Sequence, residues 1–229
     1  MKTMTTIALS MFAGVASGQT FSASATGTQS ILSDGPRAGG NTPFFHNAQG
    51  SSNGDFAGYA ASDYNLGGTG FQAGFDLDSL QFDVQQANAF FTSSGALNFY
   101  VASASNSFFD LTYAGDDVLA NPGGLEDVAF VGSGLFIETA TGSQDTFVFD
   151  FDGALDDSDA ENLIEAALLN GDSLRWVIAA ATPGTSATYG GLDNFDADAP
   201  VLSGAFSIPA PGSVALLGLA GIAARRRRG

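Results

Sequence analysis

The densest group of potential metal ligands in this sequence lies between residues 150 and 161. Calcium takes about six to eight oxygen ligands, commonly from carboxylates that alternate along a loop. The spacing departs from the helix-loop-helix calcium motif, because Ala154 stands at the third ligand position counted from Asp150. Counted from Asp157, the glycine that this motif requires is replaced by Asn162. The acids of this group are Asp150, Asp152, Asp156, Asp157, Asp159 and Glu161.

Two interpretations of this acidic group stay open. In the first, Asp150, Asp152 and Asp156 are calcium ligands in a loop. In the second, the acids from Asp156 to Glu161 stand at the start of a helix, where the helix dipole favours negative charge.

A second candidate calcium site lies in the last loop before the C-terminal region. Its carboxylates are Asp193, Asp196 and Asp198, with Asn194 between them. Sandwich domains bind structural calcium in loops of this kind. For the chain as a whole, we expect no organic cofactor. Three further acids surround a predicted strand start and are expected to face solvent: Asp76, Asp78 and Asp83.

Nucleophilic catalysis has little support in the sequence. His46 is the single histidine, and the segment Phe44–Asn47 that contains it is expected to be a surface loop without a nucleophile motif. The absence of cysteine excludes thiolate catalysis, disulfides and cysteine-based zinc sites. A glycosidase-type pair of carboxylates stays open, because such pairs are defined in space. We predict a non-enzymatic protein, with a glycan-active enzyme as the less favoured alternative.

Large aromatic side chains offer a further chemistry, the stacking of sugar rings. Trp176 lies in the apolar run Leu174–Ile178, which is more typical of a core strand, and most of the 20 phenylalanines must also be core. The candidate platform comprises Tyr59, Tyr64, Tyr100, Tyr113, Tyr189 and Trp176.

The composition favours one sizeable, acidic, β-rich domain. The chain has 229 residues, of which 45% are hydrophobic, and its 30 glycines suit short strands joined by tight turns. All 24 acids lie between Asp34 and Asp198, whereas five of the seven basic residues lie outside that span. Such an acidic surface repels phosphate groups, so we expect no nucleic-acid partner.

The elements that must position these residues are mostly strands. Leu80, Phe82 and Val84 alternate with polar residues, as in a half-buried strand. We predict hairpins at Ser93–Gly95 and at Gly142-Ser143, and therefore an all-β fold, a β-sandwich or jelly roll. The strand-like segments are 21–25, 57–61, 71–75, 80–84, 89–92, 97–102, 128–131, 135–139, 146–151 and 174–181.

One short helix is predicted beside the sheets. Ser158 and Glu161 have the spacing of an N-terminal capping box, and Gly171 fits a C-terminal cap. Between them, Leu163, Ile164, Ala167 and Leu168 form one apolar stripe.

The N-terminus has the order of a secretory signal peptide, predicted as an apolar helix over residues 1–18. Lys2 supplies the positive charge, Met4–Ala16 is apolar, and small residues follow. We favour cleavage after Gly18 over cleavage after Ala16, with a buried N-terminal helix as the alternative. Export would use the Sec translocon and signal peptidase.

Residues 208–229 form a second distinct terminal segment. Eleven residues, Val214–Ala224, carry no polar side chain, but as a helix they span only ~16 Å, whereas a bilayer core needs ~20 residues. An arginine run follows and would stay on the cytoplasmic side. The flanking residues of this tail are Pro209, Ala210, Pro211 and Gly212 before the stretch, and Arg225, Arg226, Arg227 and Arg228 after it.

This tail resembles a PEP-CTERM sorting domain. The resemblance implies recognition by an exosortase, a membrane enzyme that removes such tails near the Pro-x-Pro motif and passes the protein to the cell surface or matrix. Ala210 stands where that family has glutamate. An ordinary tail anchor without processing is the alternative. The segment Ala187–Phe195 and the following strand also resemble the closing strands of exported jelly-roll domains, some of them carbohydrate-binding-like.

The sequence thus predicts an exported protein with residues 19–207 as a sandwich ectodomain. We expect it to be briefly tethered to the inner membrane by its tail and then to be a structural or adhesive component of the cell surface or matrix. A carbohydrate-binding module that recognises polysaccharide, with calcium as its one candidate ion, is the main alternative.

Overall fold

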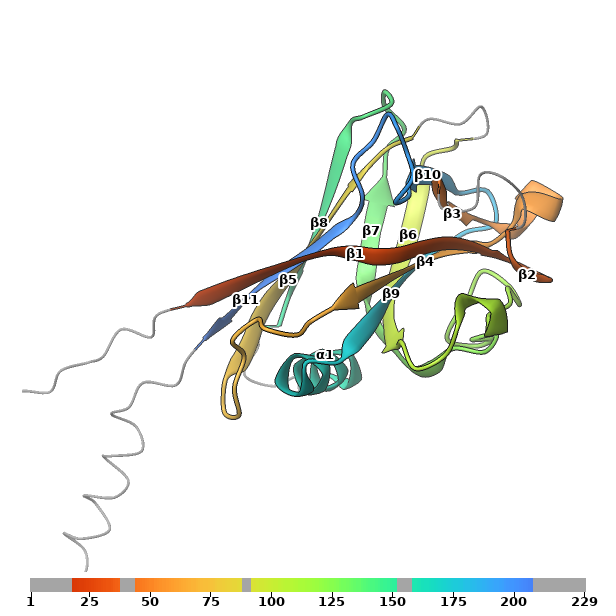
Figure 1. Cartoon of the computed structure of the whole chain (residues 1–229). Coiled ribbons are helices and arrows are strands. Elements are labelled where there is room, and N and C mark those ends of the chain that lie inside the picture. The colour runs from red at the N-terminus through yellow and green to blue at the C-terminus, as the bar shows by residue number, and fades with distance from the viewer. Residues whose placement is uncertain (1–17, 38–43, 88–91, 152–157, 208–229) are drawn as a thin grey trace, which may run out of the picture.

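The computed structural model describes residues 18–37, 44–87, 92–151 and 158–207 (Figure 1). The predicted tail at 208–229 therefore lies outside the described residues, as do residues 1–17 of the predicted signal peptide at 1–18 and residues 89–91 of the predicted strand at 89–92. The elements are β1 (Gln19–Leu32), β2 (Gly35–Pro36), β3 (Phe45–Gln49), β4 (Tyr59–Asn65), β5 (Asp76–Gln85), β6 (Gly95–Ser103), β7 (Glu126–Phe136), β8 (Gln144–Asp150), α1 (Asp159–Asn170), β9 (Ser173–Ala180), β10 (Ser186–Gly190) and β11 (Val201–Ser207), with 3-10 turns at Ser51–Phe56 and Phe108–Asp110.

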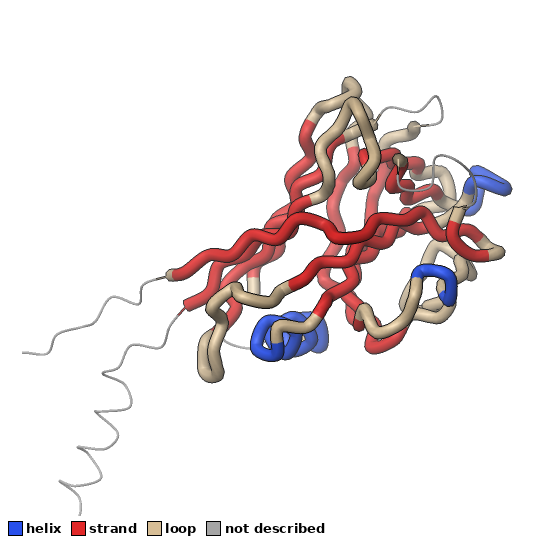
Figure 2. Tube along the Cα trace, in the orientation of Figure 1, coloured by secondary structure: helices blue, strands red, loops and turns tan. Residues whose placement is uncertain are grey.

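The described chain is dominated by one strongly curved antiparallel sheet, which confirms the predicted all-β class (Figure 2). Its strand order is β7-β6-β9-β4-β1-β11-β5-β8. The long strand β1 belongs to both halves of this order, because its first part pairs with β11 and its second part pairs with β4. A bulge between Ala25 and Gly27 marks the change of partner. The short strands β3 and β10 form a separate antiparallel pair.

The two outermost strands, β7 and β8, approach each other and nearly close the sheet. A Cβ added at Gly132 would lie 2.8 Å from the Phe149 ring, and one at Gly134 would lie 2.5 Å from the Phe147 ring. Glycine is therefore required where the aromatic rings of β8 pack on β7. The result is a nearly closed, sandwich-like fold.

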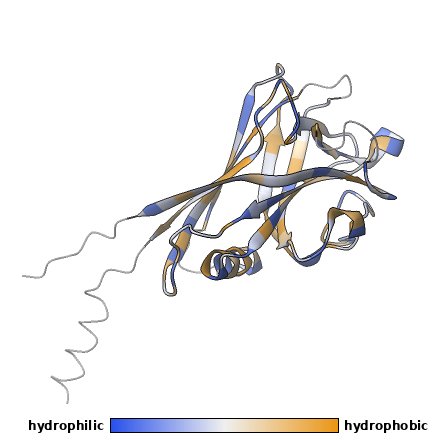
Figure 3. Ribbon diagram, in the orientation of Figure 1, coloured by the Kyte–Doolittle hydropathy of each residue, from blue (hydrophilic) through white to orange (hydrophobic). Residues whose placement is uncertain are grey.

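The interior of this sheet is an aromatic core. Trp176 is fully buried, as predicted, and Phe99 contacts its indole ring at a centroid distance of 6.0 Å. The rings of Phe147 and Phe149 lie 4.6 and 5.2 Å from that of Phe99. Figure 3 shows that apolar and polar residues are mixed along the strands. In β5, Leu80, Phe82 and Val84 are buried between half-buried polar residues, as the alternation predicts.

Several predicted strand assignments were wrong. Residues 71–75 form turns, and the segments 128–131 and 135–139 are mostly one strand, β7, that runs through two glycines. The turn at Gly142 exists, with φ +79°, but β8 pairs with β5 and not with β7. Likewise, β6 pairs with β7 and β9 and not with β5. In each case a distant strand displaced the neighbour that a hairpin would have used.

Helix α1 agrees with its prediction at both ends. The Ser158 hydroxyl accepts a hydrogen bond from the Glu161 backbone N–H at 3.1 Å, and Gly171 adopts a left-handed conformation with φ +70°. Of the predicted apolar stripe, Ile164, Ala167 and Leu168 are buried, whereas Leu163 is half-buried.

Candidate functional site

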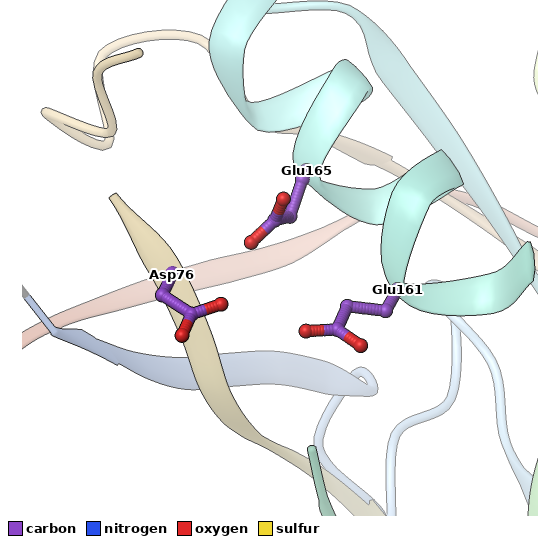
Figure 4. Close-up of side chains that lie close together, drawn as sticks. All are labelled: Asp76, Glu161 and Glu165. Carbon is purple, nitrogen blue, oxygen red and sulfur yellow. The ribbon is translucent and has the colours of Figure 1, made fainter. Parts of the chain in front are cut away.

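Three carboxylates meet where α1 packs beside the start of β5 (Figure 4). Asp76 comes from the first residue of β5, and Glu161 and Glu165 come from adjacent turns of α1. One carboxylate oxygen of each residue lies within 4.8 Å of the others. We call these three residues the carboxylate cluster.

Local structure explains how the carboxylate cluster forms. Residues four apart on a helix lie on one face, so Glu161 and Glu165 project in the same direction. The Leu77 backbone N–H donates to Glu165 Oε1 at 2.8 Å, which ties the helix to β5. Glu161 is buried, Glu165 is half-buried and Asp76 is exposed.

The chemistry of the carboxylate cluster is that of close like charges. Three ionised carboxylates at this separation repel one another, and a shared proton or a bound cation relieves that repulsion. Three carboxylates can supply up to about six oxygen ligands when each is bidentate, which suits calcium better than magnesium. The arrangement is a candidate cation site.

Sequence reasoning did not find this cluster. Asp76 is exposed, as predicted, but its proximity to α1 could not be seen because 85 positions separate it from Glu161. One signal was available, since acids at positions i and i+4 of a predicted helix must share a face.

The structure describes only some of the calcium ligands predicted from sequence. Asp150 ends β8 and is exposed, while Asp152 and Asp156 lie outside the described residues. In the last loop, Asp198 exchanges two hydrogen bonds with Gln85, each at 2.9 Å. Among the described residues, Asp193, Asp196 and Asp198 form no group with the spacing of metal ligands.

His46 was expected on a surface loop, and this was wrong. It lies in β3, paired with Tyr189, and is fully buried. Burial lowers the pKa of its imidazole to about 3, although the nearby backbone of Ala61 acts in the opposite direction. Within the described residues neither ring nitrogen forms a hydrogen bond of ordinary geometry. The imidazole is therefore neutral and enclosed at physiological pH.

The predicted aromatic platform does not form on the surface. Tyr59, Tyr64, Tyr189 and Trp176 are all buried, because they sit in strands whose faces are covered. Tyr100 is also almost fully buried and reaches solvent only at a pocket on the outer face of the sheet. Tyr113 is half-buried and donates its hydroxyl hydrogen to Asp116 Oδ1 at 2.8 Å.

The residues of the sorting motif, Pro209–Gly212 and Arg225–Arg228, lie outside the described residues. In the part of the chain that the structure describes, no helix has the length and apolar character needed to cross a membrane. Comparison with protein-family models gives no match, and comparison with curated proteins gives none either.

Proposed function

We propose that this chain is an exported protein of the cell surface or extracellular matrix, with a structural or adhesive ectodomain and a tail processed by an exosortase-type enzyme. The observation that carries the proposal is the order of the C-terminal segment. Pro209-Ala210-Pro211-Gly212 precedes the apolar stretch Val214–Ala224, and Arg225–Arg228 follow it. The segment is paired with an N-terminal signal sequence at residues 1–18.

The limits of the fold support this division. Strand β1 begins at Gln19, immediately after the favoured cleavage position, and β11 ends at Ser207, immediately before the tail. Gln19 pairs with Phe206. The strand pairings of the described residues all lie within residues 19–207, the span proposed as the ectodomain. We further classify the fold as a jelly-roll variant, on the strength of two half-sheets that share β1.

The apolar stretch is too short to span a bilayer core as a stable membrane anchor. It spans about half of a bilayer core, and Pro209 and Pro211 interrupt any extension of its helix. The arginine run holds the end of the chain on the cytoplasmic side. A weak anchor with a fixed orientation suits a segment that a membrane enzyme must recognise and remove.

Mass spectrometry of the C-terminus of surface protein from the native host tests this proposal. We expect the mature chain to end close to Pro211. Replacement of all four arginines 225–228 by asparagine is expected to leave unprocessed, mislocalised chain. Arg37→Gln, which removes a positive charge from the ectodomain, is expected to leave processing unchanged. An intact Arg225–Gly229 end on mature surface protein would overturn the proposal.

A second candidate function is a carbohydrate-binding module. It is favoured by one observation, a pocket lined by aromatic and hydrogen-bonding side chains on the outer face of the sheet. Retention on polysaccharide by the full-length chain separates this candidate from a purely structural role.

A further inference from the structure

The outer face of β6, β7 and β9 is only partly covered. The segment 104–125 crosses it and forms a second apolar cluster, in which Leu111, Val118 and Leu125 pack on Tyr100 and Val177. Beside this cover lies a pocket of about 380 Å³, which we call the outer-face pocket. Its volume falls in the range of about 300–1,000 Å³ that is usual for small-molecule sites.

The covering segment is firmly attached, so the outer-face pocket has a fixed wall. Arg175 is almost fully buried and binds both carboxylate oxygens of Asp63, at 2.7 and 2.9 Å. The same guanidinium donates to the side chain and backbone oxygens of Asn106 and stacks on the Phe108 ring at 4.6 Å. Further along, Asp116 accepts hydrogen bonds from both the backbone N–H and the hydroxyl of Ser51.

One side of the outer-face pocket is apolar. Phe130 on β7 is paired with Tyr100 on β6, and their rings meet edge to face at a centroid distance of 5.5 Å. A bulge in β7 next to this pair shifts the register and aims Phe130 outward. Phe130 remains 44% exposed, so its ring is available to a ligand.

The polar groups of the outer-face pocket include both donors and acceptors. Asn98 Oδ1 accepts from the Ser133 hydroxyl at 2.7 Å, and the Asn98 side chain also interacts with the Tyr100 hydroxyl, which leaves one of its two amide hydrogens to donate. Asp117 Oδ1 accepts from the backbone N–H groups of Leu119 and Ala120, which leaves its second oxygen as an acceptor. Burial raises the pKa of Tyr100, so its hydroxyl stays protonated and can also donate.

We propose that the outer-face pocket binds a neutral sugar ring of an extracellular glycan. The apolar face of a sugar ring stacks on Phe130, and its hydroxyls both donate to Asp117 and accept from Asn98. A simple cation would bind Asp117 but would leave the Asn98 amide donor without a hydrogen-bond acceptor. An acidic glycan would be repelled by Asp116, Asp117 and a chain of net charge −17. The inference rests on the second candidate function and names its site and ligand class.

A glycan array tests the proposal, with the full-length chain in detergent applied to neutral, acidic and amine-bearing oligosaccharides. We expect retention of neutral glycans. Phe130→Ala is expected to weaken that retention about tenfold, because the stacking surface is lost. Phe109→Ala is the matched control, since Phe109 is 84% exposed and does not line the pocket. Thermal unfolding of each variant checks that it is folded.

Asp117→Asn distinguishes a sugar from a cation. The asparagine oxygen can still cap Leu119 and Ala120. Its amide NH2, which replaces the second carboxylate oxygen, can donate to a sugar hydroxyl, so we expect a loss of only a few-fold with neutral glycans. Retention of amine-bearing glycans alone, abolished by Asp117→Asn, would overturn the neutral-sugar assignment. Equal retention by Phe130→Ala and the native chain would place binding elsewhere and overturn the pocket, while carbohydrate binding would stand. Retention of no glycan would overturn both the pocket assignment and the carbohydrate-binding candidate. The sorting proposal is tested separately, by mass spectrometry of the C-terminus.

Discussion

The two faces of β6 differ in what surrounds their aromatic residues. Phe99 points inward and contacts four other rings, those of Phe82, Phe147, Phe149 and Trp176. Tyr100, the next residue, points outward to a single ring, that of Phe130, and to the pocket beside it. The inner face is covered by the same curved sheet, whereas the outer face is covered by an irregular segment that leaves space. Binding chemistry is therefore to be sought where the cover is irregular.

The sharpest test of this contrast compares Phe99→Ala with Phe130→Ala. We expect Phe99→Ala to lower the free energy of unfolding by about 3–5 kcal/mol, because it leaves a cavity among packed rings. Phe130→Ala is expected to change it by less than about 1 kcal/mol, since the ring is partly exposed. Urea denaturation measures both, and similar losses would break the distinction between the two faces.

A second test concerns the attachment of the outer segment. Asp63→Ala leaves the Arg175 guanidinium buried without its carboxylate, and we expect a loss of about 3 kcal/mol in unfolding free energy. In Asp63→Ala, we expect amide hydrogen exchange to become faster in segment 104–125 than in the strands of the curved sheet. Asp55→Ala, an exposed acid in a 3-10 turn, is the control. A uniform increase across all strands would show that the outer segment is not held separately.

His46 lies in the separate β3–β10 pair, and its buried imidazole makes stability depend on pH. The folded-state pKa of about 3 lies below the ordinary value of 6.5, so the unfolded chain takes up the proton first as pH falls. Stability is complete above about pH 6.5 and declines below it, by about 2 kcal/mol at pH 5. We expect His46→Gln to show a flatter profile of unfolding free energy between pH 7 and pH 5. Parallel profiles for the two chains would contradict this.

The smallest expected effect is at the carboxylate cluster, on the rim between sheet and helix. In chelator, Asp76→Asn removes one of three close charges, and we expect Tm to rise by about 1 °C. Asp78→Asn, two residues along β5, is the matched control. A rise in the Tm of the native chain with millimolar calcium that Asp76→Asn lacks would identify a cation site. Equal changes in Tm for Asp76→Asn and Asp78→Asn would show that the three carboxylates do not act together.

Features set by local sequence were predictable. The caps of α1 at Ser158 and Gly171 and the alternation around Phe82 depend on neighbours in the chain, and the structure agrees with them. The pairing of β5 with β11 was not predictable, because more than a hundred positions separate the two strands. Gly132 and Gly134 lie between two predicted strands, 128–131 and 135–139, and are expected to separate them. In the structure they lie within β7, where the aromatic rings of β8 pack on it. The carboxylate cluster and the outer-face pocket were missed for the same reason, since each joins residues that are distant in sequence.

The position of β11 has a consequence for the order of events during folding. This strand lies between β1 and β5, yet it is the last described strand to be synthesised. Neither half of the sheet can join the other until residues 201–207 have left the ribosome, so the contacts that complete the fold span almost the whole described chain. The curved sheet therefore remains incomplete until its final strand emerges.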